Sequence, residues 1–230
     1  TLNNNIAGVY SLQGNIDGAI KAMQTTVTNL NLFLKEDISD FRRTHARQFL
    51  FQAIENYAGL YKDIGDYAKA EQLLTLAFKQ KQKHFNAESP ELHKAKILLG
   101  QINVTLKNFK KAETLLNEGI QGLENHSDQN THWLAGAYYN NGLVKMAMDE
   151  NDTAKSYFLK SEFHYKASLG DYYDEIYLDF TINASNFFAQ IGEREKALKM
   201  AREALIYIKS NQGEATLLEY FQQLNLADIY

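Results

Sequence analysis

The feature that most constrains this chain is a pattern of small residues that recurs five times. An alanine follows each break in the pattern by five residues, and another small residue precedes each break by seven residues. The breaks lie at Gly14, Gly65, Lys107, Asp149 and Gly192. The alanines are Ala19, Ala70, Ala112, Ala154 and Ala197, and the preceding small residues are Ala7, Ala58, Gly100, Gly142 and Ser185. Since the last four alanines are spaced by 42 or 43 residues, the chain reads as an array of similar units.

Close packing of two helices explains this pattern. Each unit is predicted to contain a helix A, a tight turn at the break and a helix B, with small residues where the two backbones cross. The residue at the break ends helix A by taking a left-handed conformation, which glycine adopts most easily. An aromatic residue precedes the break by four positions at Tyr10, Tyr61 and Phe188, whereas Asn103 and Lys145 occupy that place in the other two units.

The apolar residues repeat with a helical period, and the chain has a single proline and 45% apolar residues, so the sequence predicts an all-α fold. The predicted helices are 2–13, 17–34, 40–63, 67–84, 90–106, 109–124, 130–148, 151–168, 172–190, 194–210 and 214–230. The first unit is nine residues longer than the others. We expect the extra residues near 35–44 to form an extended loop or a lengthened helix start, either as filler or as a surface with its own function.

The pattern resembles that of the tetratricopeptide repeat (TPR) family. The 42-residue period and the link KHFNAESPELHKAK, with Ser89 as a predicted N-cap and Pro90 in the first helical turn, resemble the kinesin-light-chain subtype. The resemblance implies a right-handed superhelical solenoid of about five and a half repeats, with a concave groove that binds a partner. We interpret 1–230 as a single array, with units at 1–37, 38–88, 89–127, 128–169, 170–212 and a partial unit at 213–230.

Asparagine recurs two residues before the small residue of helix A. We name Asn5, Asn56, Asn140 and Asn183 the asparagine ladder; Leu98 and Leu224 occupy the same place in the other units. Asparagine is a mediocre helix former, so its recurrence calls for a reason. In the TPR family, residues at this place line the groove and bond the main chain of an extended peptide, which an amide suits because it donates and accepts. The alternative is that the asparagines satisfy carbonyl groups of the adjacent helix as part of repeat packing.

Other positions on the same predicted face complete the candidate binding set. They are Glu55, Gln101, Tyr139 and Asn186. Neither lysine nor arginine lies beside the asparagines, so a clamp for a C-terminal carboxylate is not expected.

Aromatic residues crowd the second half of the chain, and we expect most of them in the core between helices. Tyr139 and Tyr173 are predicted to be exposed contacts, while the run RRTHAR at 42–47 is either a solvated helix start or a contact for an acidic partner.

Motifs for chemistry are missing from the sequence. The six histidines show no HExxH spacing, no phosphate-binding glycine loop is present and cysteine is absent, so we expect no metal, no cofactor and no enzyme activity. The net charge of −4 with interspersed signs disfavours nucleic acid and membrane as partners. No long apolar run and no secretion signal is seen, which predicts a soluble, cytoplasmic chain.

These observations predict a non-catalytic scaffold that binds a protein or peptide in the concave groove formed by the A helices. Two alternatives stay open at this point. The chain is also consistent with a sensory or regulatory segment of a larger signalling protein, such as a kinase, a DNA-binding regulator or a caspase-like protease, because an unpaired sixth helix A would indicate a longer parent. A third possibility is a self-assembly module whose ends stack. The sequence does not decide the oligomeric state or the identity of the partner.

Overall fold

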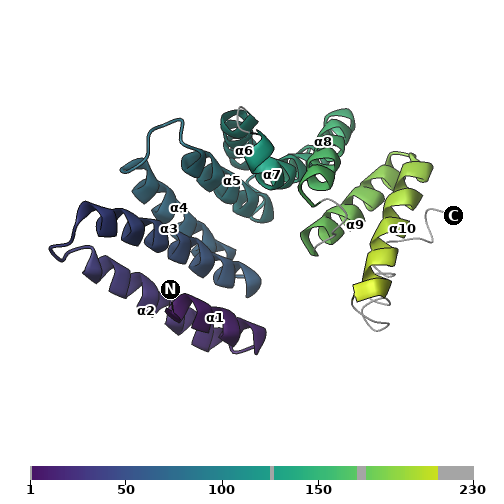
Figure 1. Cartoon of the computed structure of the whole chain (residues 1–230). Helices are drawn as coiled ribbons and strands as arrows, with labels where there is room; N and C mark the ends of the chain where they lie inside the picture. The colour runs from purple at the N-terminus through teal and green to yellow at the C-terminus, as the bar shows by residue number, and fades with distance from the viewer. Residues whose placement is uncertain (1, 125–126, 170–174, 212–230) are drawn as a thin grey trace. The chain divides into compact units, whose positions relative to one another are not determined.

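The computed structural model describes residues 2–124, 127–169 and 175–211, and this part of the chain contains ten α-helices and no strand. The helices are α1 (Leu2–Leu12), α2 (Ile16–Phe33), α3 (Asp40–Asp63), α4 (Tyr67–Gln82), α5 (Pro90–Thr105), α6 (Phe109–Glu124), α7 (Ser127–Ala147), α8 (Asn151–Leu169), α9 (Glu175–Gln190) and α10 (Arg194–Asn211). They form five consecutive antiparallel hairpins (Figure 1). The predicted all-α helical-repeat fold is therefore confirmed.

The helix boundaries agree closely with those predicted. Ser89 accepts a hydrogen bond from the Glu91 backbone N–H at 3.2 Å and caps α5, with Pro90 in the first turn, as expected. Asn130, the predicted start of the seventh helix, has non-helical φ and ψ inside α7. The predicted helix 214–230, including Leu224 and Ala227, lies outside the described residues, and so does Tyr173.

All five breaks have the predicted left-handed conformation. Gly14, Gly65 and Gly192 have φ between 71° and 82°, and Lys107 and Asp149 have φ of 59°. The residue after each break donates its N–H to the carbonyl five residues earlier, at 2.8 or 2.9 Å in every hairpin. This bond is the one that closes a Schellman motif. The lysine and aspartate breaks thus use the same backbone geometry as the glycine breaks.

The small residues lie where the helices of each hairpin cross, as predicted. The five alanines after the breaks and the five small residues before them are all buried. A Cβ atom on Gly100 would come within 2.6 Å of Leu116 Cγ, so α5 and α6 approach too closely for a larger residue there. Ser185 uses its place differently, because its hydroxyl donates to the Ala197 carbonyl at 2.9 Å.

Residue contacts divide the chain into two compact units, unit 1 (Thr1–Asn125) and unit 2 (His126–Tyr230). The single array 1–230 stays a prediction. Unit 1 has small apolar clusters between hairpins, such as Ala58, Ala70, Leu74, Leu99 and Ile102. Unit 2 has a large cluster rich in aromatic residues, including Phe158, Tyr165, Phe180, Phe187 and Phe188. The predicted core role of most aromatics in the second half is confirmed for these residues.

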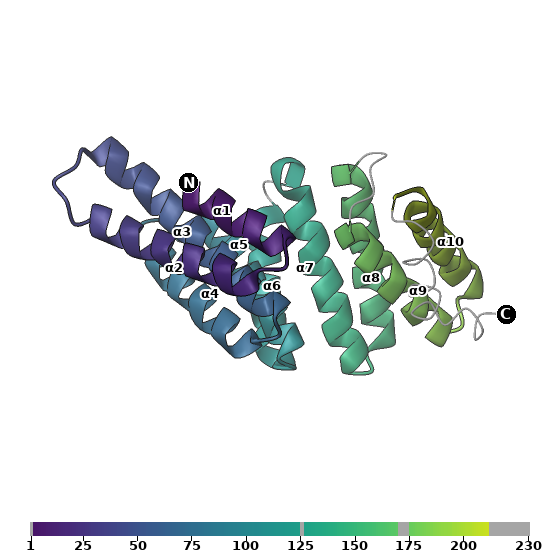
Figure 2. The ribbon, with the colours of Figure 1, turned by 90° about the horizontal axis from the view of Figure 1, so that it is seen from below.

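The insertion in the first unit lengthens a helix. The α3 helix begins at Asp40, is capped by Ser39 and has 24 residues, whereas α5, the A helix of the third hairpin, has 16. Figure 2 shows α2 and α3 side by side, with their connecting loop extending beyond α1. Arg43 holds this loop against the helix, because its guanidinium donates to the carbonyl groups of Leu34, Glu36 and Ile38 at 2.8, 3.3 and 3.5 Å. The lengthened helix start is therefore the expectation that the structure confirms.

Candidate partner-binding face

The asparagine ladder lies at the solvent side of the A helices. Asn5 on α1 and Asn56 on α3 are exposed, and Asn140 on α7 and Asn183 on α9 are half-buried. The residue two positions later is buried in each of these helices. Because two residues differ by about 200° around a helix, the small residue faces helix B while the asparagine faces away from it. Whether the four asparagines form one continuous surface stays a prediction.

Two ladder asparagines bond to their own helix. Asn140 Nδ2 donates to the Gly136 carbonyl at 2.7 Å, and Asn183 Nδ2 donates to the Asp179 carbonyl at 2.8 Å. The packing alternative predicted bonds to the adjacent helix, and these are bonds within one helix. Such bonds leave the side-chain oxygen with accepting capacity, since an amide oxygen has two lone pairs.

A polar cluster joins the two A helices of unit 2. The Tyr139 hydroxyl on α7 donates to Asp179 Oδ2 on α9 at 2.9 Å, and Asn183 Nδ2 lies 3.2 Å from the other Asp179 oxygen. Burial raises the pKa of Tyr139 well above 10, and the Asp179 charge raises it further. The phenol therefore stays a neutral donor.

The expectation that Tyr139 is exposed is wrong. Only 7% of this residue is accessible. Its ring packs edge-on against Phe180, with centroids 5.7 Å apart. The sequence pattern placed Tyr139 one position before the ladder but did not reveal that α9 would cover it. Asp179, which the sequence analysis did not single out, precedes the ladder residue Asn183 by one helical turn, and this spacing was the available signal.

The remaining candidates have mixed surroundings. Glu55 forms an ion pair with Lys81, a buried lysine in the last turn of α4. The helical phase of α3 gave no sign of Lys81, because that residue lies on a B helix. Gln101 on α5 and Asn186 on α9 are half-buried. The role of these residues in partner binding stays a prediction.

Charged residues with shifted pKa values tie neighbouring helices together. Burial alone would raise the pKa of Glu162, but Lys166 at 2.8 Å and Lys196 outweigh it and lower this pKa. The hydrogen bond from Lys111 is the main cause of the lowered pKa of Glu71. Structural ion pairs of this kind perturb pKa values without any catalytic role.

Within ranges 2–124, 127–169 and 175–211, no group of three or more His, Cys, Asp or Glu side chains is placed to hold a metal ion. None of the helices in the described part combines the length and the apolarity that crossing a membrane requires.

Solved structures of repeat proteins superpose on this chain. BtubC (BKLC) from P. vanneervenii has a TM-score of 0.71 at 16% sequence identity, over 92% of this chain and 82% of that chain. The structure of Podosopora anserina putative kinesin light chain nearly identical TPR-like repeats has a TM-score of 0.61 at 14% identity, over 92% and 96% of the two chains.

The fold is TPR-like. The apo form of RapI also superposes on this TPR-like chain, with a TM-score of 0.62 at 16% identity. That match covers 98% of this chain and 62% of RapI. At such identities the likeness shows the fold alone, so the 42-residue subtype stays a prediction. No family model matches the TPR-like chain, and no curated protein has a significant match to it.

Proposed function

We propose that this TPR-like chain is a non-catalytic scaffold that binds a peptide segment of a partner protein along its A helices. The observation that carries the proposal is the position of the asparagine ladder. Each ladder residue lies at the surface, exposed or half-buried, while the residue two positions later is buried. A residue that served only to pack the hairpin would be expected on the buried side instead.

The chemistry of the ladder suits a peptide main chain. An amide side chain accepts from a peptide N–H and donates to a peptide C=O, whatever side chains the peptide carries. In Asn140 and Asn183 the amide nitrogen already bonds a carbonyl of the same helix. This bond orients the side chain and lowers the entropy lost when a peptide N–H reaches the oxygen. The half-buried surroundings of both residues strengthen such a bond relative to one in open water.

A displayed library of random peptides, selected on the wild-type chain, tests this function. The affinities of the enriched peptides are then measured for Asn140→Ala combined with Asn183→Ala, two ladder residues of unit 2. Each lost hydrogen bond is worth about 1 kcal/mol, or roughly a fivefold change in Kd, so the double variant should bind at least about tenfold more weakly.

Asn31→Ala is the matched control, because Asn31 Nδ2 donates to the Val27 carbonyl at 2.9 Å on α2, outside the ladder. This control loses the same kind of bond within one helix and should bind peptides like the wild type. Equal loss in the control and the double variant, or no effect in either, would show that the ladder has only a structural role.

A further inference from the structure

One side of α3 carries a continuous exposed face from Arg42 to Asn56. Its residues are spaced alternately by three and four positions, so they share one side of the helix. We name this set the α3 stripe: Arg42, His45, Phe49, Gln52 and Asn56. All five residues are exposed. The stripe thus runs without interruption from the lengthened helix start to the ladder residue of this hairpin.

The stripe lies on a different side of α3 from the residues that pack against its neighbours. Ala7 of α1 packs with Ala53 and Tyr57, which lie in the second half of α3. The α3 helix packs against α2 and α4 through Leu50 and Ile54, which lie on other sides of the helix. The packing of α3 on these helices therefore leaves the stripe residues exposed.

Aromatic side chains make this face suitable for binding. Phe41, beside the stripe, is 73% exposed, and Phe49 within it is 44% exposed. The rings of Phe41 and His45 lie with centroids 4.2 Å apart, and His45 Nδ1 donates to the Phe41 carbonyl at 2.8 Å. On the buried sides of α3, Phe51 packs on Phe85 and Tyr57 belongs to a core cluster. Phe41 and Phe49 are not part of that core packing. Clustered exposed aromatic residues mark interaction surfaces.

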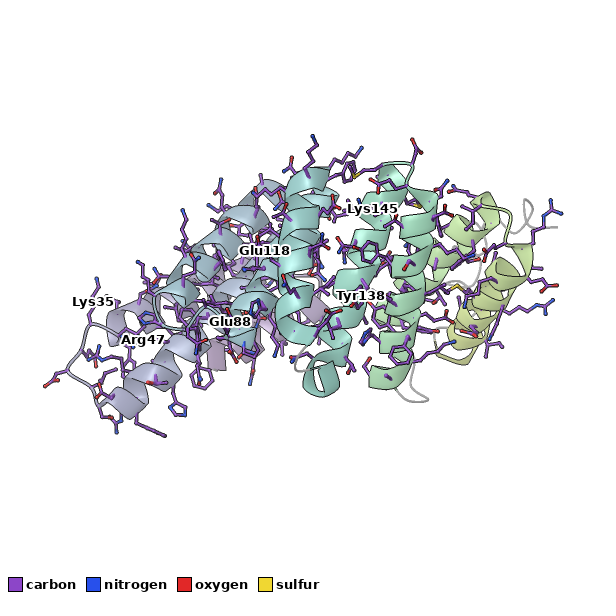
Figure 3. The ribbon with its side chains drawn as sticks, turned by 90° about the horizontal axis from the view of Figure 1, so that it is seen from above. Lys35, Arg47, Glu88, Glu118, Tyr138 and Lys145 are labelled. Carbon is purple, nitrogen blue, oxygen red and sulfur yellow. The ribbon has the colours of Figure 1, made fainter. Side chains whose placement is uncertain are left out.

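The charge around the stripe is positive. Residues 41–54 contain three arginines and no aspartate or glutamate. Arg43 is occupied by loop carbonyls, whereas Arg42 lies exposed within the stripe. Arg47 is close enough to His84 to lower its pKa, although burial is the larger cause. Figure 3 shows Arg47 and Lys35 at the same end of unit 1. Acidic residues at this end precede the stripe, in the loop and at Asp40 in the first turn of α3.

We propose that the α3 stripe binds an acidic, amphipathic helix of a partner protein. The alternating spacing of three and four residues places the five side chains along one side of α3, where side chains of a second helix can insert between them. Phe41 and Phe49 would cover the apolar side of the incoming helix, and Arg42 would pair with its carboxylates. The proposal rests on the proposed scaffold function and gives it a partner class and a location. A nucleic acid fits less well, because the whole chain has a net charge of −4.

A synthetic helical peptide of three heptads provides the probe. It carries leucine at the seam positions, glutamate at the flanking positions and a fluorophore for anisotropy measurements. Binding to the wild-type chain is compared with binding to Arg42→Glu and to Phe49→Ala. Each change should weaken Kd by about tenfold or more, since an arginine or aromatic residue central to an interface has that effect. The loss in Arg42→Glu should shrink as salt is added.

Two controls separate docking from unfolding and from general stickiness. Phe163→Ala removes another exposed aromatic, 69% accessible on α8, and should leave Kd unchanged within about twofold. A peptide with lysine in place of glutamate should bind the wild type weakly and bind Arg42→Glu more tightly. Circular dichroism of each variant should match the wild type because all the changed side chains are exposed.

The proposal is overturned if the acidic peptide fails to bind, or binds both stripe variants as tightly as the wild type. It is also overturned if a single-stranded oligonucleotide binds in an Arg42-dependent way while the acidic peptide does not. Peptides selected from the library distinguish the two proposals. If they depend on Asn140 and Asn183 while the stripe variants bind the acidic probe normally, only the α3 stripe proposal fails. If the stripe variants lose the probe while Asn140→Ala with Asn183→Ala retains every selected peptide, only the ladder proposal fails.

Discussion

The two units build the same hairpins from different residues. In unit 1, α5 and α6 cross where Gly100 meets Leu116, and in unit 2, α7 and α8 cross where Gly142 meets Phe158. Leu116 and Phe158 both follow the repeated alanine of helix B by one turn. The unit 1 clusters are built mainly from alanine and aliphatic residues, while the unit 2 cluster contains aromatic rings in mutual contact.

This difference shows that one backbone geometry tolerates two kinds of core packing, aliphatic and aromatic. Phe158 contacts the ring of Phe187 with centroids 4.7 Å apart, so unit 2 depends on rings between its helices. In unit 1, Phe41 and Phe49 are exposed. Phenylalanine is therefore a packing element at Phe158 and an exposed residue at Phe41 and Phe49, and mutations can separate these roles.

The largest expected effect is the loss of a ring from unit 2. Phe158→Ala should lower the free energy of unfolding by about 3–5 kcal/mol, because the cavity lies among rings that cannot close around it. Leu116→Ala at the matching place in unit 1 should cost about 2–4 kcal/mol. Urea denaturation followed by circular dichroism measures both. A smaller loss for Phe158→Ala than for Leu116→Ala would contradict the dependence of unit 2 on its rings.

A moderate effect is expected where the helices cross. Gly100→Ala places a Cβ atom 2.6 Å from Leu116 Cγ, so we expect a loss of about 1–3 kcal/mol from overpacking. Gly142→Ala meets the Phe158 ring at 3.3 Å. A shift of a few tenths of an ångström relieves that contact, and the gain in helix propensity of about 1 kcal/mol offsets its cost. Thermal melts of the two variants compare the crossings. Equal losses would mean that the two crossings are equally tight.

The smallest effect concerns a histidine in unit 1. His93 is 6% exposed and lies against Gly122. Burial is the main cause of its lowered pKa. Because the unfolded chain then binds more protons below pH 6.5, stability should fall as the pH drops from 7.5 to 5.5, by at most about 1.4 kcal/mol per pH unit for one proton. The lowered pKa values of Glu71, Glu91 and Glu162 keep those carboxylates ionised in this range.

Melting temperatures of the wild type and His93→Gln across this pH range test the effect. The variant should lose less stability on acidification than the wild type. His84→Gln is the control for the other histidine with a lowered pKa in unit 1. If His93→Gln and the wild type respond identically to pH, His93 does not contribute.

Most of the fold could be predicted from the sequence because its determinants are local. A left-handed break, an N-cap and a small residue at a crossing each depend on a few neighbouring residues. Even the breaks without glycine, at Lys107 and Asp149, were predicted from their place in the repeat, and both have φ of 59°. The predicted start at Asn130 falls at the kink inside α7, which begins at Ser127.

The candidate site could be predicted only in part. The repeat phase predicted that Asn56 lies on the open side of α3, and this residue is exposed. Tyr139 has a neighbouring phase but is covered by α9, and Lys81 from a B helix reaches Glu55. These contacts join residues 40 and 26 positions apart. Helical phase describes one helix and contains no information about which side chain of another helix arrives there.

By itself, the amino-acid sequence determined the helices, their breaks and the spacing that lets each hairpin close, because small side chains and left-handed turns act over short distances. Only the tertiary structure decided which surface residues stay open. Exposure depends on which helix packs against each face: Arg42 and Phe49 on α3 stay exposed, whereas α9 lies over Tyr139 and removes it from solvent.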